Sequence, residues 1–447
     1  MKKLHIKILL LFAFVSSCQL TDVLDQDPPN NLVPENVVKT ESDAKAILNG
    51  VYSQIISFSN AYYYMYSELI PGALSGSMST IGFGSAAEFA TNSLLYENSH
   101  VENFWLIKYR VMDAANNTIK LVGELPDSEF TGNNKNEIIG EAHFLRAMAT
   151  FDLLRYFGEF YDVNSPYGII VRTTPVNFVT RNKERSTVLE TYSQILLDLD
   201  YAIANAPEFS VSFRASKLAA KALKARVLLF MGNPEEAAFV ADEVISSPLR
   251  SLEGTFEQVF NKGLNSNEMI LMTHRNADSD TEDNNRKRFY SGRTGTTWLP
   301  AIMNGDPRVP LTYSGQNILK VNHVNTYRPT YFIRLAEMYL IKAEGLAFSN
   351  LASLEEIQEP LNVVRLRAGI GESQAVTIQE VKEEIFNEYV RELVFENGSE
   401  WFSAIRFNKI MDLKPQITSS NQFILPIPES EISGNAKVTL SDQNPGY

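Results

Sequence analysis

Apolar residues recur at helical spacing along most of the chain. Between residues 42 and 53 they stand at Ala44, Ile47, Leu48 and Val51, which share one face of a helix. The same spacing predicts further helices over Glu102–Val122, Asn136–Tyr156, Thr187–Ala204, Ala215–Met231, Pro234–Ile245, Thr330–Phe348, Leu354–Ala368 and Thr377–Phe395. The predicted fold class is therefore all-α, with long irregular loops and little strand.

The starts of three predicted helices carry the capping-box spacing. In this motif a Ser or Thr at the N-cap and a Glu three residues later satisfy two backbone amides that lack helical partners. The three pairs are Thr187 with Glu190, Ser353 with Glu356, and Thr377 with Glu380. These positions are the most closely defined helix boundaries in the sequence.

Several predicted helices follow one another after short turns. Residues 215–245 place small or apolar residues where two antiparallel helices would touch, as in a degenerate tetratricopeptide unit. Ile333–Phe348 followed by Leu354–Ala368 has the same design. No strict period links the pairs, which predicts a helical scaffold with tetratricopeptide-like pairs rather than a regular solenoid.

Two long stretches lack a helical period, Phe58–Asn98 and about His274–Asn325. The first is rich in Tyr, Ser, Gly and Asn, and the second holds scattered aromatic residues among Gly, Asn and Asp. Long irregular segments in compact proteins are commonly functional or disordered, and the aromatic residues argue against plain disorder here. Aromatic rings with nearby polar groups suit the apolar faces and hydroxyl rims of sugars. The candidate ligand-binding residues are Tyr62, Tyr64, Tyr66, Phe83, Arg288, Tyr290 and Trp298. The alternative is that these rings pack the loops onto the helices.

The N-terminus has the layout of a secretory signal peptide over residues 1–17. Lys2, Lys3 and Lys7 precede an apolar stretch from Ile8 to Val15, which is too short to span a bilayer. The run Val15-Ser-Ser-Cys18 resembles a bacterial lipobox, in which the Cys is acylated, for example with palmitate. Cys18 is the only Cys in the chain, so an intramolecular disulfide is excluded and lipidation is the predicted role.

Residues 18–40 are expected to form an extended tether from the lipid to the fold. Pro28, Pro29 and Pro34 stand among Asn and Asp there, and no helical pattern survives. Residues 41–447 are predicted to form a single domain, with a helical scaffold over about 41–250 and a second part over about 251–447.

Charge narrows the range of partners. The formal net charge is −13, and removal of residues 1–17, which hold three Lys and no acidic residue, makes it −16. An acidic body argues against binding to nucleic acid or to an anionic lipid surface.

Enzyme and metal signatures are weak. Beyond residue 17, His occurs only at 100, 143, 274 and 323, without zinc-ligand spacing. Gly371–Ala375 is close to a nucleophile elbow but lies between two predicted helices. Asp278–Asn284 departs from a calcium loop at its sixth and twelfth positions, Asp283 and Phe289. We expect no catalytic residue, metal or cofactor. The two carboxylates of a glycosidase are defined by their distance in space and not by sequence spacing, and nothing in this sequence singles out such a pair.

Several stretches resemble the SusD/RagB family of outer-membrane lipoproteins of Bacteroidetes. The most specific are C-terminal: Tyr327–Ala347, Leu361–Gly369, Glu388–Glu396 with Trp401, Phe402 and Arg406, and Leu425–Pro428 with Gln443–Tyr447. Weaker matches are Leu24–Tyr52, Glu141–Gly158 and Asp306–Arg308. The chain departs from the family pattern at Ala436 and at Ser399-Glu400.

The charged residues of these stretches have a structural interpretation of their own. Arg334 with Glu337, and Arg391 with Glu392, are expected to form ion pairs between helices. Pro426, Pro428 and Pro445 predict an extended tail laid over the helices.

The resemblance implies a lipid-anchored, non-enzymatic protein on the outer face of the outer membrane. Such a protein would hold an oligosaccharide and act as the lid of a SusC-like TonB-dependent transporter. Its ligand residues would lie in variable loops, which here correspond to the two aromatic stretches. Peptide capture in the same role, a surface hydrolase on a helical scaffold, and a purely structural lipoprotein remain alternatives.

Overall fold

The fold is mainly helical. The computed structural model describes residues 38–56, 63, 65–82, 84–273, 289–294, 297–322 and 329–447. Its α-helices are α3 (Glu41–Ile56), α5 (Tyr66–Ser75), α6 (Glu88–Thr91), α7 (Ser99–Glu124), α8 (Asn134–Phe157), α9 (Val188–Asn205), α10 (Lys217–Phe230), α11 (Pro234–Ile245), α12 (Phe256–Lys262), α14 (Trp298–Ile302), α15 (Val309–Thr312), α16 (Leu335–Ser349), α17 (Leu354–Arg367), α18 (Ile378–Leu393), α19 (Ser399–Arg406), α20 (Ile410–Leu413) and α21 (Glu429–Gly434).

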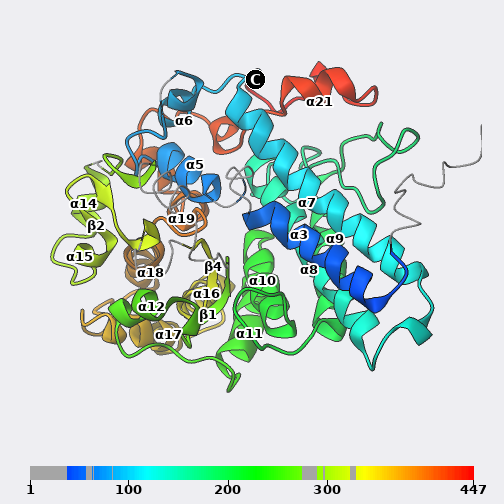
Figure 1. The fold of residues 1–447 in the computed structure, drawn as a ribbon. Coiled ribbons are helices and arrows are strands. Elements are labelled where there is room, and N and C mark those ends of the chain that lie inside the picture. The colour runs from blue at the N-terminus through cyan, green and yellow to red at the C-terminus, as the bar shows by residue number, and fades with distance from the viewer. Residues whose placement is uncertain are drawn as a thin grey trace, which may run out of the picture.

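The longer helices pack in an order close to that of the sequence. Helices α3, α7, α8 and α9 lie side by side, α10 and α11 follow, and α16 packs against α11 and then against α17 and α18 (Figure 1). Gly345 of α16 faces α11 so closely that a Cβ would strike the backbone carbonyl of Pro234. The predicted pairs α10–α11 and α16–α17 are therefore real, and close contact between α11 and α16 joins them into one scaffold.

Local signals placed the helix starts correctly. All three capping boxes form, with Thr187, Ser353 and Thr377 at the N-caps of α9, α17 and α18. Residues 371–375 connect α17 to α18 without helical or strand structure, so the connection between helices is confirmed. The hydrophobic side chains form one large buried cluster and a smaller one among α16, α17 and α18.

The predicted helix over Thr330–Phe348 is wrong in its first part. Residues Tyr331–Arg334 form strand β4, and helix α16 begins only at Leu335. Strand β4 pairs antiparallel with β1 (Met269–Met272), in a register that sets Met269 opposite Arg334. All four residues of each strand are buried, so the strands show no alternation of apolar and polar residues that would distinguish strand from helix.

The two stretches predicted to be irregular contain short elements. Helix α5 falls in the first, where all ten of its residues are buried, so no amphipathic period marks it. The second contains α14, α15 and a small hairpin of β2 (Tyr313–Ser314) and β3 (Asn317–Ile318). Short 3₁₀ helices occur at Gly84–Ala87, Asp127–Glu129, Gly263–Asn265, Lys320–Asn322, Ser420–Phe423 and Leu440–Asp442.

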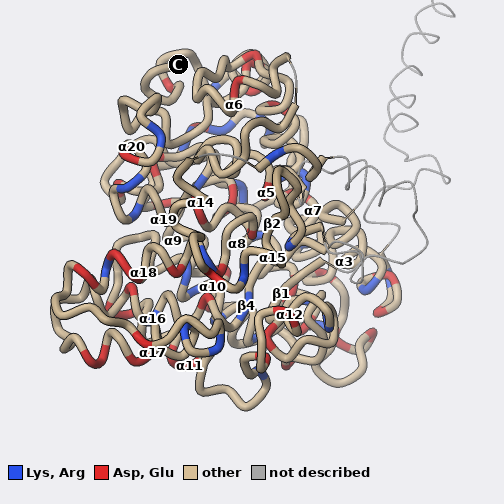
Figure 2. The backbone as a smooth tube through the Cα atoms, turned by 90° about the vertical axis from the view of Figure 1, so that its left-hand side faces the viewer, with Lys and Arg blue, Asp and Glu red and all other residues tan. Residues whose placement is uncertain are grey.

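Lys and Arg are distributed along the whole fold and do not gather in one basic tract, as Figure 2 shows. Within the part of the chain that is described, no helix has the length and apolar character needed to cross a bilayer.

The extended segment 424–428 hydrogen-bonds to the scaffold, because the Leu425 amide donates to the Tyr156 carbonyl at 2.7 Å. The predicted C-terminal tail is thereby confirmed for this segment.

Candidate functional site: an aromatic junction

The described parts of the two aromatic stretches meet in space. We call the contact between residues 65–98 and 289–322 the aromatic junction. The Ser79 amide donates to the Arg293 carbonyl at 2.7 Å, and Met78 forms an isolated antiparallel bridge with Thr294. Arg293 Nη1 also donates to the Thr80 carbonyl at 3.0 Å. Figure 1 shows α14 and β2 on the same side of the molecule as α5.

The end of α5 makes this contact possible. Gly76 follows the helix in the left-handed conformation, with φ at +83°, which a glycine adopts without steric cost. The chain then reverses, and residues 77–80 run toward Arg293. Helix α5 is thus the buried support on which the second segment is docked.

Three predicted ligand residues lie inside the junction with little exposed surface. Tyr290 is 0% exposed and donates its hydroxyl hydrogen bond to Glu68 of α5. Trp298 is 8% exposed, and its Nε1 donates to the Ser75 carbonyl at 3.2 Å. Tyr66 is 6% exposed. In this conformation the three side chains hold the two segments together, and contact with a ligand would need the surrounding chain to move.

The other predicted residues fall outside the described part of the chain. Tyr62, Tyr64, Phe83 and Arg288 belong to this group, as do Cys18 and the acidic loop at residues 278–284. Their roles as ligand contacts, lipid attachment site or solvated loop stay predictions. In the sequence, Tyr64 and Arg288 stand next to the junction, because Met65 and Phe289 follow them directly.

Two half-buried rings extend the junction beyond the prediction. The His100 ring stacks on Tyr66 with centroids 5.9 Å apart and ring planes at 22°. Phe289 meets Tyr66 edge-on, with centroids 6.2 Å apart. Tyr66 is buried between them, while both neighbours keep part of their surface exposed. In the sequence, His100 was considered only as a possible metal ligand. No local pattern indicates that it lies next to Tyr66.

His100 is held at the start of helix α7. The side chain of the N-cap residue Asn98 accepts hydrogen bonds from the backbone amides of His100 and Val101, which fixes the first turn. Burial lowers the pKa of His100, although the nearby Glu88 acts in the opposite direction. The imidazole is therefore uncharged at neutral pH, and the three rings form an aromatic surface without a formal charge.

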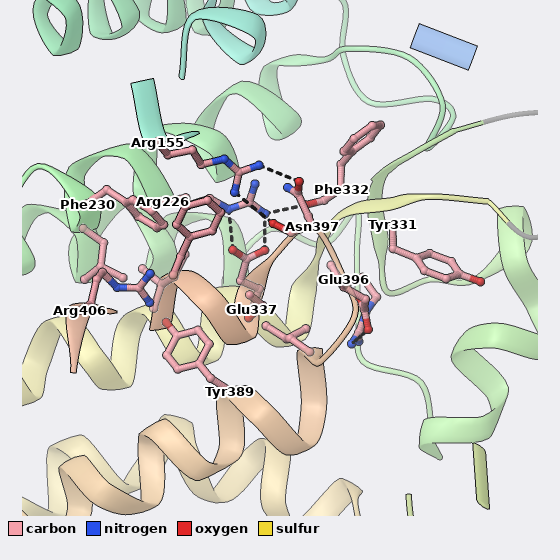
Figure 3. Close-up of a pocket in the computed structure, with 16 residues that line it drawn as sticks. Arg155, Arg226, Phe230, Tyr331, Phe332, Glu337, Tyr389, Glu396, Asn397 and Arg406 are labelled. Atoms are coloured by element: carbon pink, nitrogen blue, oxygen red, sulfur yellow. Dashed lines mark hydrogen bonds and ion pairs between the residues drawn. The ribbon is translucent and has the colours of Figure 1, made fainter. Parts of the chain in front are cut away.

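A small internal cavity offers no alternative ligand site. It lies between β4 and helices α10, α16, α18 and α19, and Figure 3 shows charged side chains around it. Arg226 pairs there with Glu337, and Arg155 donates to Asn397. Its volume is about 30 Å³, far below the roughly 300–1,000 Å³ of a typical ligand pocket.

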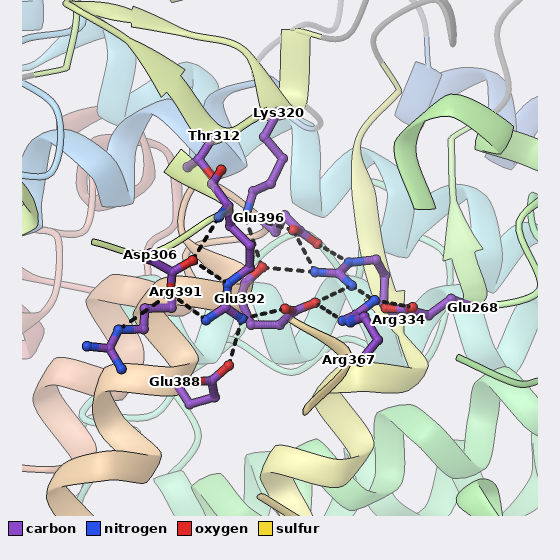
Figure 4. A network of polar contacts seen from close by, with 11 residues as sticks. Glu268, Asp306, Thr312, Lys320, Arg334, Arg367, Glu388, Arg391, Glu392 and Glu396 are labelled. Atoms are coloured by element: carbon purple, nitrogen blue, oxygen red, sulfur yellow. Dashed lines mark hydrogen bonds and ion pairs between the residues drawn. The ribbon is translucent and has the colours of Figure 1, made fainter. Parts of the chain in front are cut away.

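The C-terminal motif residues build a buried ion-pair network rather than a site. Figure 4 shows Arg334 between three carboxylates, those of Glu268, Glu392 and Glu396. The full network pairs Arg308, Lys320, Arg334 and Arg367 with Glu268, Asp306, Glu388, Glu392 and Glu396. The prediction that Arg334 and Glu337 form ion pairs between separate elements is confirmed. Arg334 pairs with the three carboxylates above, and Glu337 pairs with Arg226 of α10.

The electrostatics of the network follow from this arrangement. Burial by itself would raise the pKa of Glu392, but Arg367, Arg334 and Arg308 outweigh it and hold that pKa at about 2. Glu392 is therefore an ionised structural group at neutral pH. It accepts hydrogen bonds from Arg334 and Arg367 through one oxygen and from Arg308 through the other.

One buried carboxylate has a different electrostatic environment. Burial raises the pKa of Glu400 on α19 to about 7, against hydrogen bonds from Ser77 and the Phe395 amide. A raised pKa is common in catalytic acids. Glu400, however, is fully buried, so a substrate has no access to it in this structure. Among the described residues, no group of three or more His, Cys, Asp or Glu is arranged to hold a metal ion.

Comparison with known proteins identifies the family. A family model described as "Starch-binding associating with outer membrane" matches residues 22–229, and the SusD family model matches residues 318–418. SusD-like protein P2 of Formosa agariphila is 24% identical over the whole of both chains. A SusD-like protein of Bacteroides ovatus is 22% identical over 93% of this chain and 83% of its own.

Solved structures share the fold. A SusD superfamily protein of Bacteroides thetaiotaomicron superposes with a TM-score of 0.75 at 22% identity, covering 91% of this chain and 100% of the other. A laminarin-binding SusD-like protein superposes with a TM-score of 0.72 at 21% identity, covering 92% and 100%. With its helical scaffold, its C-terminal motifs and both family models in agreement, the chain belongs to the SusD/RagB family.

Proposed function

We propose that this protein is a surface lipoprotein of the outer membrane that captures a neutral oligosaccharide at the aromatic junction. The observation that carries the proposal is the group of Tyr66, His100 and Phe289, brought together from segments more than 180 residues apart. His100 and Phe289 are uncharged and partly exposed, and such rings suit the apolar faces of sugars. The starch-binding description of the matching family model and the laminarin-binding relative support the same ligand class.

The candidate ligand residues of the loops would complete this surface. Tyr62, Tyr64, Phe83 and Arg288 are proposed as further contacts, because Tyr64 and Arg288 directly precede Met65 and Phe289. Residues 230–317 lie outside both family-model matches, and that range includes Phe289. We propose that this part of the chain adapts a shared scaffold to one particular glycan.

The anchor would set the protein's place in the membrane. We propose that Cys18 carries lipid and that residues 18–40 tether it to α3, which begins at Glu41. A multiply acylated Cys would hold the protein at the membrane surface, while the Pro-containing tether would let the body tilt. Such a body would act as a lid that delivers the glycan to a SusC-like TonB-dependent transporter.

Binding to a defined glycan panel tests the capture site. Laminarin and starch oligosaccharides are titrated into the purified protein, into Phe289→Ala, and into Phe239→Ala as the matched control. Phe239 lies on α11 and is 66% exposed, away from the junction. Loss of one stacking ring is expected to weaken binding about tenfold in Phe289→Ala and to leave the control unchanged.

The outcome separates the candidate ligands. Equal affinity of Phe289→Ala and wild type for every bound glycan would show that the junction is not the capture site. Binding of short neutral peptides in place of glycans, reduced by the same substitution, would assign the site to peptide capture. Hydrolysis of the offered glycan by the wild-type protein would contradict a non-enzymatic role.

Affinity purification from membranes tests the proposed partner. The lipidated protein is expected to bring down a TonB-dependent barrel, and Cys18→Ser is expected to be lost from the membrane fraction. A wild-type protein that purifies from native membranes without any such barrel would contradict the lid role.

A further inference from the structure

A second, larger pocket lies away from the aromatic junction. It has a volume of about 460 Å³, which is within the range of small-ligand pockets. It opens among the chain after α8, the turn between α10 and α11, and the ends of α16 and α19. Neither segment of the junction contributes a residue to its lining.

Aromatic side chains form much of the wall. Tyr161 and Phe423 meet edge-on with centroids 5.5 Å apart, and both are half-buried. Phe348 stands at the end of α16 with 37% of its surface exposed. Lys382 Nζ lies 4.1 Å from the centroid of this ring and so occupies one of its faces. The pocket therefore offers apolar ring surface from three separate elements.

Two polar groups in the lining have hydrogen-bonding capacity to spare. Arg406 donates through Nε and Nη2 to the two carboxylate oxygens of Glu344, at 2.7 and 2.8 Å. Its Nη1 makes no hydrogen bond with any described residue. Asn408, at the exposed end of α19, likewise has a side-chain amide without a hydrogen-bond partner in the described part of the chain. Its backbone is left-handed, with φ at +55°.

The guanidinium group is rigidly placed. The Arg406 Cζ lies 4.6 Å from the centroid of the Phe230 ring, and the fork to Glu344 fixes its plane. Arg406 and Phe230 line both this pocket and the small cavity, and Figure 3 shows them on the side of that cavity away from Tyr331. A ligand in the pocket would thus meet a pre-oriented donor.

Charge favours a neutral ligand. The Glu344 carboxylate already balances Arg406. The chain as a whole carries a formal charge of −13, which opposes the approach of an anion. Sugar hydroxyls can accept from Arg406 Nη1 and from the Asn408 amide, while the carbon faces of the sugar pack on the rings.

We propose that the pocket bounded by Tyr161, Phe348, Arg406, Asn408 and Phe423 is a second carbohydrate site. It would take one neutral hexopyranose, free or at the end of a glycan chain. This site is independent of the aromatic junction and does not rest on the capture function proposed there. It would give the protein two separate points of contact with carbohydrate.

The test uses simple probes. Methyl α-glucoside, methyl β-glucoside, methyl β-galactoside and the anionic methyl β-glucuronide are titrated by saturation-transfer NMR and soaked into crystals of the protein. The neutral glycosides are expected to bind, with density in the pocket, and the glucuronide more weakly. Phe348→Ala is expected to weaken binding about tenfold, and Asn408→Gly about threefold.

The variants are chosen to keep the fold. Phe348 is partly exposed, and glycine at position 408 adopts the left-handed conformation readily. Phe239→Ala serves as the matched exposed control and should bind like wild type. Phe289→Ala should also keep this binding, which separates the pocket from the junction.

Three results would overturn the proposal. They are the absence of binding by any neutral glycoside, unchanged affinity in both Phe348→Ala and Asn408→Gly, and density for the glycoside only outside the pocket. Binding of the glucuronide at least as tight as that of the neutral glycosides would overturn the assignment to neutral sugars.

Discussion

The buried ion-pair network and the aromatic junction both join distant parts of the chain, but with opposite chemistry. In the network, Arg334 holds three carboxylates from two distant places in the sequence, and both Arg334 and Glu392 are fully buried. In the junction, the second segment bonds to the backbone of residues 78–79 after α5 and packs its rings on α5, while Phe289 and His100 stay partly exposed. The network uses its polar groups on one another, whereas the junction keeps surface for a ligand.

A substitution should have different consequences in the two regions. A buried carboxylate that pairs with three cations is committed to the fold, because separating the pair would leave charge without water or partner. Partly exposed neutral rings carry no such penalty. The first region should therefore respond to substitution mainly through stability, and the second mainly through binding.

The largest expected effect comes from breaking the network at its centre. Arg334→Met leaves the carboxylates of Glu268, Glu392 and Glu396 with one buried cation fewer. We expect a loss of about 3–5 kcal/mol in the free energy of unfolding. Denaturant unfolding followed by circular dichroism measures it. Lys437→Met is the control, because its pair with Glu184 is exposed and should contribute less than about 1 kcal/mol. Equal effects in the two variants would contradict a structural role for the network.

Glu400 is a buried carboxylate outside the network and contrasts with the paired carboxylates inside it. Burial raises its pKa from 4.5 to about 7, so the folded state binds a proton that the unfolded state releases between these pH values. Stability should therefore fall as pH rises from 4.5 to 7. Glu400→Gln removes this penalty and should stabilise the protein by up to about 3 kcal/mol at pH 8.

The geometry permits this substitution. The Gln oxygen can accept from the Phe395 amide while its nitrogen donates to Ser77 Oγ. Thermal unfolding of both proteins from pH 4 to pH 8 provides the measurement. The two curves should converge near pH 4. A variant that is less stable than wild type at pH 8 would show that the carboxylate is ionised without penalty.

Tyr290→Phe tests whether the junction is held by polar contacts as well as by rings. The substitution removes a fully buried hydroxyl that donates to Glu68. We expect a loss of about 1–2 kcal/mol. Hydrogen exchange should show faster opening of residues 65–80 than in wild type, with α17 and α18 unchanged. Uniformly faster exchange along the chain would mean that the junction is not a separate unit of stability.

The smallest effect is expected at the start of α18, the helix that carries Glu388 and Glu392. Thr377→Ala removes the hydroxyl that accepts from the Glu380 amide in the capping box. We expect a loss of about 1 kcal/mol, because the network at the other end of the helix stays intact. Differential scanning calorimetry against wild type measures the change. A loss as large as that of Arg334→Met would contradict this order of effects.

The sequence predicted those features whose signals are local. Thr187, Ser353 and Thr377 each act within three residues, and all three helices begin where expected. Helix α5 was missed because it is buried on every side, and β4 was taken for helix because its partner β1 lies about 60 residues earlier. Pairing between strands so far apart leaves no pattern within a short window.

The candidate site was predictable only in outline. Aromatic content singled out both loop segments, but not which rings would be covered. Tyr290 and Trp298 are used for packing, and His100 joins the junction through a contact with Tyr66 that sequence spacing does not reveal. For this reason Phe289→Ala is a better test of binding than Trp298→Ala, which would also remove a largely buried indole.

The most direct test of capture at the aromatic junction is a structure of the protein with a bound laminarin or starch oligosaccharide. We expect a sugar ring in van der Waals contact, within about 4 Å, with the exposed surface of Phe289 or His100. An oligosaccharide bound with neither ring in contact would contradict capture at the aromatic junction.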